Sequence, residues 1–149
     1  MPVDVSTRTS IRRPRAEVAA YAMDPDMAPR WYVNIQSVDW RTPRPLQVGS
    51  RVAFVACFMG RRLAYTYEIV ELVPGSRLTM RTAEGPFPME TTYVFEDAGP
   101  GETLMILRNR GMPRGFGLLV APLMAMAMHR ANRKDLARLK QILEMASAT

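Results

Sequence analysis

The sequence has few of the residues from which disulfides, metal sites and nucleophilic dyads are built. It contains one cysteine, Cys57, and one histidine, His129. A single cysteine excludes a disulfide within the chain and fits a reducing cytoplasm. Because no second histidine or cysteine is present to complete a metal site or a nucleophilic dyad, we expect neither a metal ion nor another cofactor.

No stretch of the chain is apolar enough for a membrane span. The longest apolar run, from Phe116 to Met128, has thirteen residues and contains Pro122, whereas a spanning helix needs about 20. No basic segment followed by an apolar one opens the chain, so we expect no signal peptide and a cytoplasmic location. The motifs GxxxxGK, HExxH, CxxC and GxSxG are also absent, which argues against the enzyme classes that they mark.

Lysine is scarce as well. Only Lys134 and Lys140 are lysines, so 18 of the 20 basic residues are arginines, and the net charge is +6. A basic protein can bind nucleic acid, but these arginines are scattered in runs no longer than two. We therefore interpret them as solvated surface and predict no nucleic-acid partner.

The remaining composition is that of an ordinary globular protein, with 48% hydrophobic and 23% charged residues. A length of 149 residues suits one domain with a sizeable core. No internal repeat or long linker divides the chain. We therefore predict a single domain over residues 1–149.

Apolar residues alternate along most of the chain, which predicts short strands. Residues 3–11 form the first, with an apolar face of one parity, and two short helices follow, opened by Pro14 and Asp24-Pro25. Further strands are predicted, in chain order, at residues 38–41, 51–58, 63–72, 77–82, 89–96 and 103–110. The tight turns between them indicate an antiparallel meander.

The last stretch, from Gly115 to Ala146, lacks this alternation and is predicted to form one long helix. We expect an α+β fold in which a curved antiparallel sheet of about six or seven strands wraps around this helix. The first half of the helix, to Met128, is apolar on all sides. Because proline disfavours helical geometry at the residue before it, we expect a break or kink at Pro122, with residues 115–121 forming a lid.

A series of short motifs runs through the chain in a characteristic order. The motifs are Ile11–Val18 (IRRPRAEV), Asp24-Pro25 with Pro29-Arg30-Trp31, Val48–Arg51 (VGSR), Tyr67–Leu78 (YEIVELVPGSRL), Gly101–Thr103 (GET) and Asp135–Lys140 (DLARLK). In this series the chain resembles the START-like (SRPBCC) superfamily of helix-grip proteins, specifically its polyketide cyclase/dehydrase branch. The resemblance spans almost the whole chain. It implies a deep apolar cavity between the sheet and the long helix.

If the sheet grips the helix, one parity of each strand faces that cavity. On the last strand we choose the parity that sends Arg108 and Arg110 outward, although Leu104 and Ile106 are also apolar. The predicted ligand-binding residues are Trp31, Phe54, Phe58, Tyr65, Tyr67, Met80, Met89, Thr91, Tyr93, Met105, Leu107, Met124, Met128 and Asn132.

The inward tyrosines can be interpreted in two ways. In a filled core their hydroxyls would bond one another, Thr91 or Asn109, because buried hydroxyls need partners. In a cavity the same hydroxyls would offer a ligand a few polar contacts within an apolar wall. Methionines among the inward residues suit a wall that adapts to varied shapes, and equally a core whose gaps they fill.

The long helix carries polar residues on its inward face. His129 and Asn132 share one helix face, so His129 joins Tyr65, Tyr67 and Tyr93 as a candidate catalytic residue. A lone histidine is more often a hydrogen-bonded or solvent-facing residue. Asp135 is expected on the flank of this face, in reach of Arg138 or of an arginine on a strand.

Two hypotheses about function follow. The first is a binding module that holds an apolar small molecule: a lipid, an aromatic compound or a polyketide-like compound. The alternative is a polyketide cyclase or dehydratase-type enzyme, in which the cavity tyrosines and His129 polarise carbonyls or move protons. The excess apolar surface on the first half of the helix predicts a portal lip, a homodimer contact or a lipid-facing patch.

Overall fold

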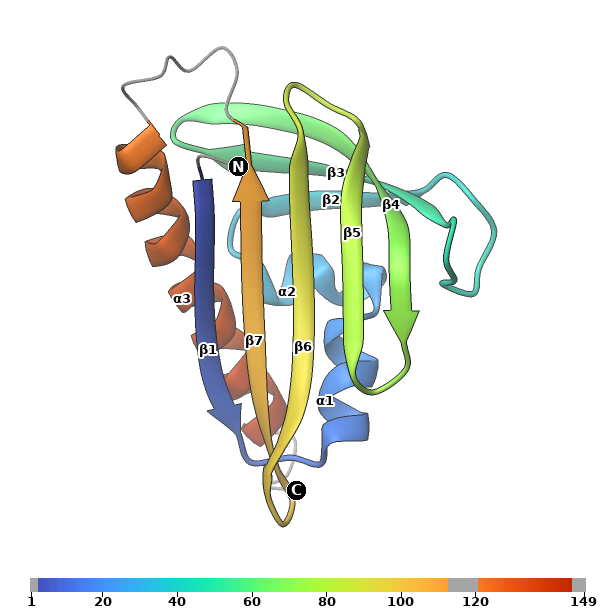
Figure 1. The fold of residues 1–149 in the computed structure, drawn as a ribbon, viewed down its shortest axis with the longest axis vertical. Coiled ribbons are helices and arrows are strands. Elements are labelled where there is room, and N and C mark those ends of the chain that lie inside the picture. The colour runs from blue at the N-terminus through green and yellow to red at the C-terminus, as the bar shows by residue number, and fades with distance from the viewer. Residues whose placement is uncertain (1–2, 113–120, 146–149) are drawn as a thin grey trace.

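The structure, a computed structural model, describes residues 3–112 and 121–145. In this part of the chain, seven strands form one antiparallel sheet in the order β1-β7-β6-β5-β4-β3-β2. The strands are β1 Val3–Ile11, β2 Ile35–Trp40, β3 Arg51–Phe58, β4 Arg61–Val73, β5 Arg77–Glu84, β6 Met89–Gly99 and β7 Glu102–Gly111. From β2 to β7 each strand pairs with the next, and β1 pairs with β7 at the edge of the sheet (Figure 1).

Short helices carry the chain from β1, at one edge of the sheet, to β2 at the other. They are α1 Arg15–Ala22, the 3-10 helix η1 Pro25–Met27, and α2 Ala28–Trp31. The Asp24 side chain accepts a hydrogen bond from the Asp26 N–H at 3.0 Å, and Pro25 occupies the first position of η1. This N-terminal signal is the one that the sequence predicts.

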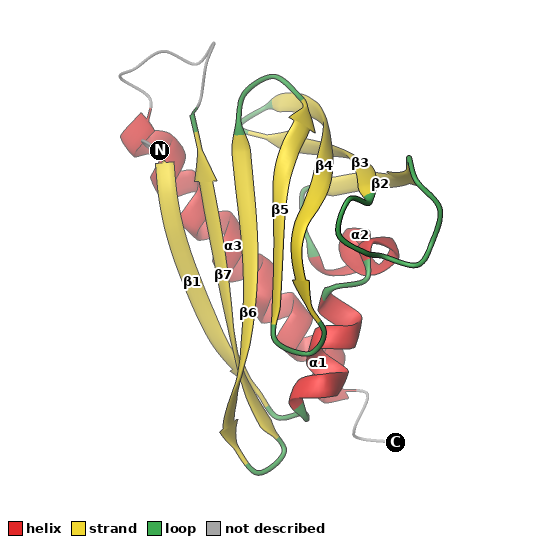
Figure 2. Cartoon of the chain, turned by 45° about the vertical axis from the view of Figure 1, so that its right-hand side comes forward, coloured by secondary structure: helices red, strands yellow, loops and turns green. Residues whose placement is uncertain are grey.

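The long helix α3, Ala121–Met145, lies across the concave side of the curled sheet (Figure 2). This arrangement confirms the predicted helix-grip fold. The helix approaches the sheet most closely along β1, and it also contacts α2. The other strands curve away from it. The inner face of β7 has the predicted parity, since Met105 and Leu107 are fully buried while Arg108 points outward and pairs with Asp4.

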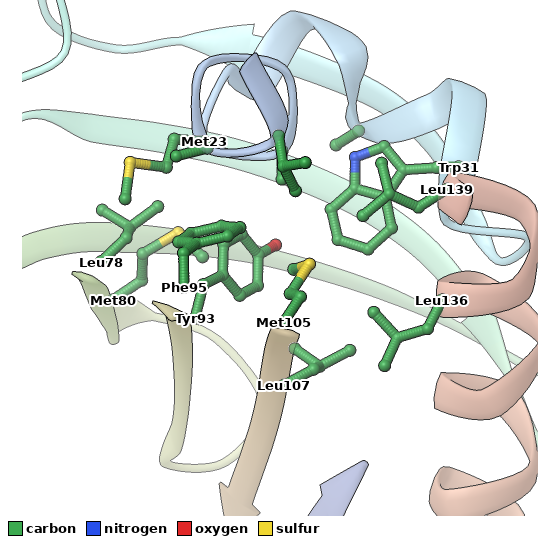
Figure 3. Close-up of a cluster of buried hydrophobic side chains, with 14 of the residues drawn as sticks. Met23, Trp31, Leu78, Met80, Tyr93, Phe95, Met105, Leu107, Leu136 and Leu139 are labelled. Atoms are coloured by element: carbon green, nitrogen blue, oxygen red, sulfur yellow. The ribbon is translucent and has the colours of Figure 1, made fainter. Parts of the chain in front are cut away.

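Apolar side chains from the sheet, the short helices and α3 meet in one core (Figure 3). Trp31 of α2 and Leu139 of α3 are both fully buried there, on the helical side of the strand residues. Thus the C-terminal half of α3 packs as the amphipathic sequence predicts.

Polar contacts fix the C-terminal end of α3 to the junction between β1 and α1. The backbone N–H of Arg12 donates to Glu144 Oε2 at 3.0 Å, and its guanidinium donates to Oε1. Arg13 Nε donates to the Leu143 carbonyl at 2.9 Å, where the helix leaves carbonyls without partners and favours positive charge. Hydrogen bonds from Lys140 and Arg12 lower the pKa of Glu144 to about 2.

Pro122 is the second described residue of α3, so the predicted break or kink at this proline involves residues outside the described ranges. The predicted lid, residues 115–121, lies outside the described residues except for Ala121. As expected, this end of the helix has more apolar surface than the sheet covers, with Leu123 58% exposed and Met126 65% exposed. None of the described helices is both long and apolar enough to cross a membrane.

Two leucines of α3 offer a matched test of this packing. Leu139→Ala is expected to lower the free energy of unfolding by about 2 to 5 kcal/mol, because it leaves a cavity in the core. Leu123→Ala makes the same chemical change at an exposed position and is expected to stay within about 0.5 kcal/mol of wild type. Urea denaturation measures both. Equal losses for the two variants would contradict this assignment of the buried face.

Candidate ligand-binding cavity

A cavity of about 120 Å³ lies between the concave face of the sheet and α3. Side chains from the short helices, from the strands and from α3 form its wall, and most of them are apolar. For comparison, an apolar cavity of about 150 Å³ takes up benzene. The space in this conformation therefore matches one small ring.

Most of the predicted ligand-binding residues lie on this wall. They are Phe54, Phe58, Tyr65, Tyr67, Met80, Met89, Thr91, Tyr93, Met124, Met128 and Asn132. Trp31, Met105 and Leu107 do not line it. Instead they are fully buried in the core beside the cavity (Figure 3).

The structure does not bring His129 together with the cavity tyrosines. His129 is exposed and lines a groove between α3 and β1, beside Asp4 and Ser6. Tyr65, Tyr67 and Tyr93 all line the cavity. A role for His129 in chemistry inside the cavity has no support from this geometry.

One chain of hydrogen bonds crosses the sheet on the cavity wall. The Thr91 hydroxyl donates to Asn109 Oδ1 at 2.6 Å, so it must accept from the Tyr67 hydroxyl, which lies 2.8 Å away. Burial raises the pKa of Tyr67 to about 12. This tyrosine is therefore a neutral side chain whose proton is already engaged.

Tyr32, which no pattern in the sequence marks as inward, supplies a second polar contact. Its hydroxyl lies 2.5 Å from the Tyr93 hydroxyl, and both residues line the cavity. Burial raises the pKa of Tyr32, Tyr65 and Tyr93. The Tyr65 hydroxyl makes no hydrogen bond with the part of the chain that the structure describes, and it remains available as a donor.

Asp135 is the least expected member of the wall. The sequence places it on a flank of the helix near Arg138, but it is only 2% exposed and faces the cavity. Its Oδ1 accepts a hydrogen bond from the Val33 N–H at 2.9 Å, which ties α3 to the connection between α2 and β2. No arginine pairs with it among the described residues. Burial raises the pKa of Asp135 to about 6, against the opposing effect of the Val33 hydrogen bond.

Asn132 lies one turn before Asp135 on the same face of α3. It is also 2% exposed and lines the cavity, and its Nδ2 has no hydrogen-bond partner among the residues that the structure describes. The charge of Asp135 contributes to the raised pKa values of Tyr32, Tyr65 and Tyr93. Thus the polar groups of α3 and the tyrosines of the opposite wall share one small volume.

Residues that could hold a metal ion are not gathered anywhere in ranges 3–112 and 121–145. No group of three or more histidines, cysteines, aspartates and glutamates in those ranges lies close enough together. The polar groups that line this cavity can form hydrogen bonds with a ligand, and Asp135 can transfer a proton.

The chain matches a known protein family over nearly its whole length. The model of the family "Polyketide cyclase / dehydrase and lipid transport" matches residues 2–144. The chain belongs to this family. Membership confirms the resemblance that the sequence motifs carry. No curated protein matches the sequence.

Solved structures share the fold over nearly the whole length of the family domain. A protein from Thermus thermophilus is 22% identical with a TM-score of 0.82, covering 98% of this chain and 99% of its own. A START superfamily protein from Mycobacterium smegmatis is 13% identical with a TM-score of 0.80, covering 96% and 98%. The Zhui aromatase/cyclase from a Streptomyces species is 16% identical with a TM-score of 0.79, covering 95% and 93%.

The buried carboxylate of Asp135 predicts a distinct dependence of stability on pH. Since its folded pKa is raised from 3.8 to about 6, the native state binds more protons between these values, and stability falls as the pH rises through this window. Above this window, burial of the charged carboxylate lowers the free energy of unfolding by about 3 kcal/mol. Asp135→Asn cannot ionise and keeps an acceptor for the Val33 N–H.

The variant is therefore expected to gain stability relative to wild type, by up to about 3 kcal/mol, as the pH rises from 4 to 7. Urea denaturation of both proteins at each pH measures this difference. Asp39→Asn, at an exposed position, is the matched control. A difference for Asp135→Asn that does not change with pH would show that the carboxylate is not held in an apolar environment.

Proposed function

We propose that this protein is a cytoplasmic binding protein for an apolar small molecule, which it holds in the cavity between the sheet and α3. The observation that carries the proposal is an apolar hollow lined by a few inward polar groups, the usual composition of a small-molecule site. The family description includes lipid transport. A lipid, an aromatic compound or a polyketide-like compound each satisfies the apolar wall.

The size of the cavity and the nature of its wall bear on which ligands fit. At about 120 Å³ the cavity is smaller than ligand sites of roughly 300 to 1,000 Å³ in other proteins. Its wall includes five methionines: Met23, Met80, Met89, Met124 and Met128. Methionine side chains change conformation easily. We infer that ligands larger than one ring enter by displacing them.

Asp135 supports an enzyme as the second candidate. A carboxyl group with a pKa of about 6 is suited to general acid–base catalysis near neutral pH. The protonated tyrosines beside it can donate hydrogen bonds to a carbonyl. A cyclase or dehydratase-type reaction would then use Asp135 and Tyr65 rather than His129. The Zhui aromatase/cyclase shares the fold, but a fold alone does not determine the reaction.

The homodimer remains a separate prediction. The exposed Leu123 and Met126 lie at the N-terminal end of α3, where the sequence predicts such a contact. Sedimentation at increasing protein concentration tests it, with Met126→Glu as the variant expected to abolish a dimer. The absence of a nucleic-acid partner also stays a prediction.

Two alanines of β3 provide a test of the binding function. Ala56 lines the cavity, whereas Ala53 has the opposite parity on the same strand. Toluene is expected to raise the melting temperature of the wild-type protein and of Ala53→Leu, because a ligand that binds only the folded state stabilises it. Ala56→Leu fills the cavity and is expected to abolish this rise.

Methionine methyl NMR of the same three proteins shows where toluene binds. Shifts at Met80 and Met89 are expected in wild type and Ala53→Leu, and none in Ala56→Leu. Toluene that raises the melting temperature of all three proteins equally would place its site outside this cavity. If toluene changes neither the melting temperature nor the methyl signals of the wild-type protein, the proposed function is wrong.

A further inference from the structure

Two polar side chains of α3 have hydrogen-bonding capacity that the described protein does not use. Asn132 Nδ2 is a buried donor that has no partner in residues 3–112 and 121–145. Asp135 receives one hydrogen bond, from Val33 to Oδ1, and Oδ2 receives none from the described residues. Both side chains are 2% exposed, and both line the cavity. Buried polar groups in this condition are costly unless something in the cavity satisfies them.

Helix geometry brings this donor and this acceptor together. Residues three apart lie on one face, with their Cβ atoms about 5 to 6 Å apart. A single atom between the two side chains can therefore reach both. The group that complements the pair must donate to Asp135 and accept from Asn132.

Only some ligand groups meet this requirement. A hydroxyl both donates and accepts, so it satisfies both side chains at once. An ammonium group donates to Asp135 but leaves Asn132 Nδ2 unpaired, and a carboxylate is repelled by Asp135. A hydrocarbon leaves both groups unpaired.

The surrounding wall contains no better partner for Asp135. The Tyr32 and Tyr93 hydroxyls bond each other, and the Tyr67 hydroxyl donates to Thr91. Within the described residues Asp135 has no ion pair. The phenols of Tyr32, Tyr65 and Tyr93 on the opposite wall are neutral. Arg110 also lines the cavity, but it forms its ion pairs with Asp4 and Glu90.

The shape of the wall favours a ring beside that hydroxyl. Tyr65 has its ring centroid 5.0 Å from Tyr67 and 5.7 Å from Phe54, which presents tilted and edge-on aromatic surfaces to the cavity. Aromatic rings pack favourably in such arrangements. A space of about 120 Å³ accommodates one ring.

We propose that the cavity binds a hydroxylated aromatic ring, whose phenolic hydroxyl donates to Asp135 and accepts from Asn132 Nδ2. The pair fixes which end of the ligand points toward α3, while the aromatic wall holds the ring. This proposal rests on the proposed function, because it specifies the ligand class of the same cavity.

Phenol and toluene test the proposal directly, because they share a ring and differ by a hydroxyl in place of a methyl group. Their dissociation constants are measured by NMR titration at pH 7.5 for the wild type, Asn132→Leu and Asp135→Asn. Benzylamine and benzoate are measured on the wild type. Ala53→Leu, outside the cavity, is the control for general effects of substitution.

The measured quantity is the preference for phenol over toluene. It is expected to fall about tenfold in Asn132→Leu, which removes the donor, and by a similar factor in Asp135→Asn, which turns an amide N–H₂ toward the ligand. Toluene binding to Asn132→Leu is expected to persist, which shows that the cavity is intact. On the wild type, benzylamine and benzoate are expected to bind more weakly than phenol.

Three results would overturn the proposal while leaving an apolar binding function in place. They are an unchanged phenol preference in both variants, tighter binding of benzylamine than of phenol, and tighter binding of benzoate. Failure of every probe to bind the wild type would instead remove the proposed function itself. The two failures are therefore distinguishable in one set of titrations.

Discussion

The closure of the curled sheet by α3 is the constraint on which the cavity depends. The C-terminal turn of the helix is fixed to the junction of β1 and α1 by Arg12, Arg13 and Glu144, and Leu139 is buried in the core. Along its length the helix approaches β1 most closely. Because the sheet curves away from β1 toward β2, the gap between helix and sheet widens in that direction. The cavity occupies this gap, bounded by the short helices.

Stability and function make opposite demands on this space. Four buried side-chain atoms lack a hydrogen-bond partner within the described residues: Thr7 Oγ1, Trp31 Nε1, Arg110 Nε and Asn132 Nδ2. Arg110 still forms ion pairs with Asp4 and Glu90, and neither Thr7 nor Trp31 lines the cavity. Asn132 is different, since it lines the cavity, makes no ion pair, and lies one turn from Asp135 Oδ2, which accepts no hydrogen bond from the described residues. A buried polar group without a partner lowers stability, and natural proteins retain such groups where a functional site uses them.

The fold could be predicted from the sequence because its signals are local. Alternating residues define the strands, and Pro14 and Pro25 mark the short helices. The site depends on relations that are not local. Tyr32 follows α2 without any periodic pattern, so nothing in the sequence pairs it with Tyr93. The sequence also does not define which face of α3 turns toward the cavity. Residues three apart on a helix are offset by about 60° around its axis. A face centred between Asn132 and Asp135 therefore leaves His129 at its edge, outside the cavity.

Specificity in such a cavity must come mainly from its polar end. An apolar wall distinguishes ligands that differ by one methylene by only about 1 to 3 kcal/mol, whereas a site built to bond a hydroxyl discriminates more strongly against analogues that lack it. The methionines of this wall weaken selection by shape further, because they adapt to what is bound. Asn132 and Asp135 lie on a helix whose end is fixed to the sheet, so their positions are set by the fold. The wall can then change shape around a ligand, while Asn132 and Asp135 keep the orientation of the ligand constant.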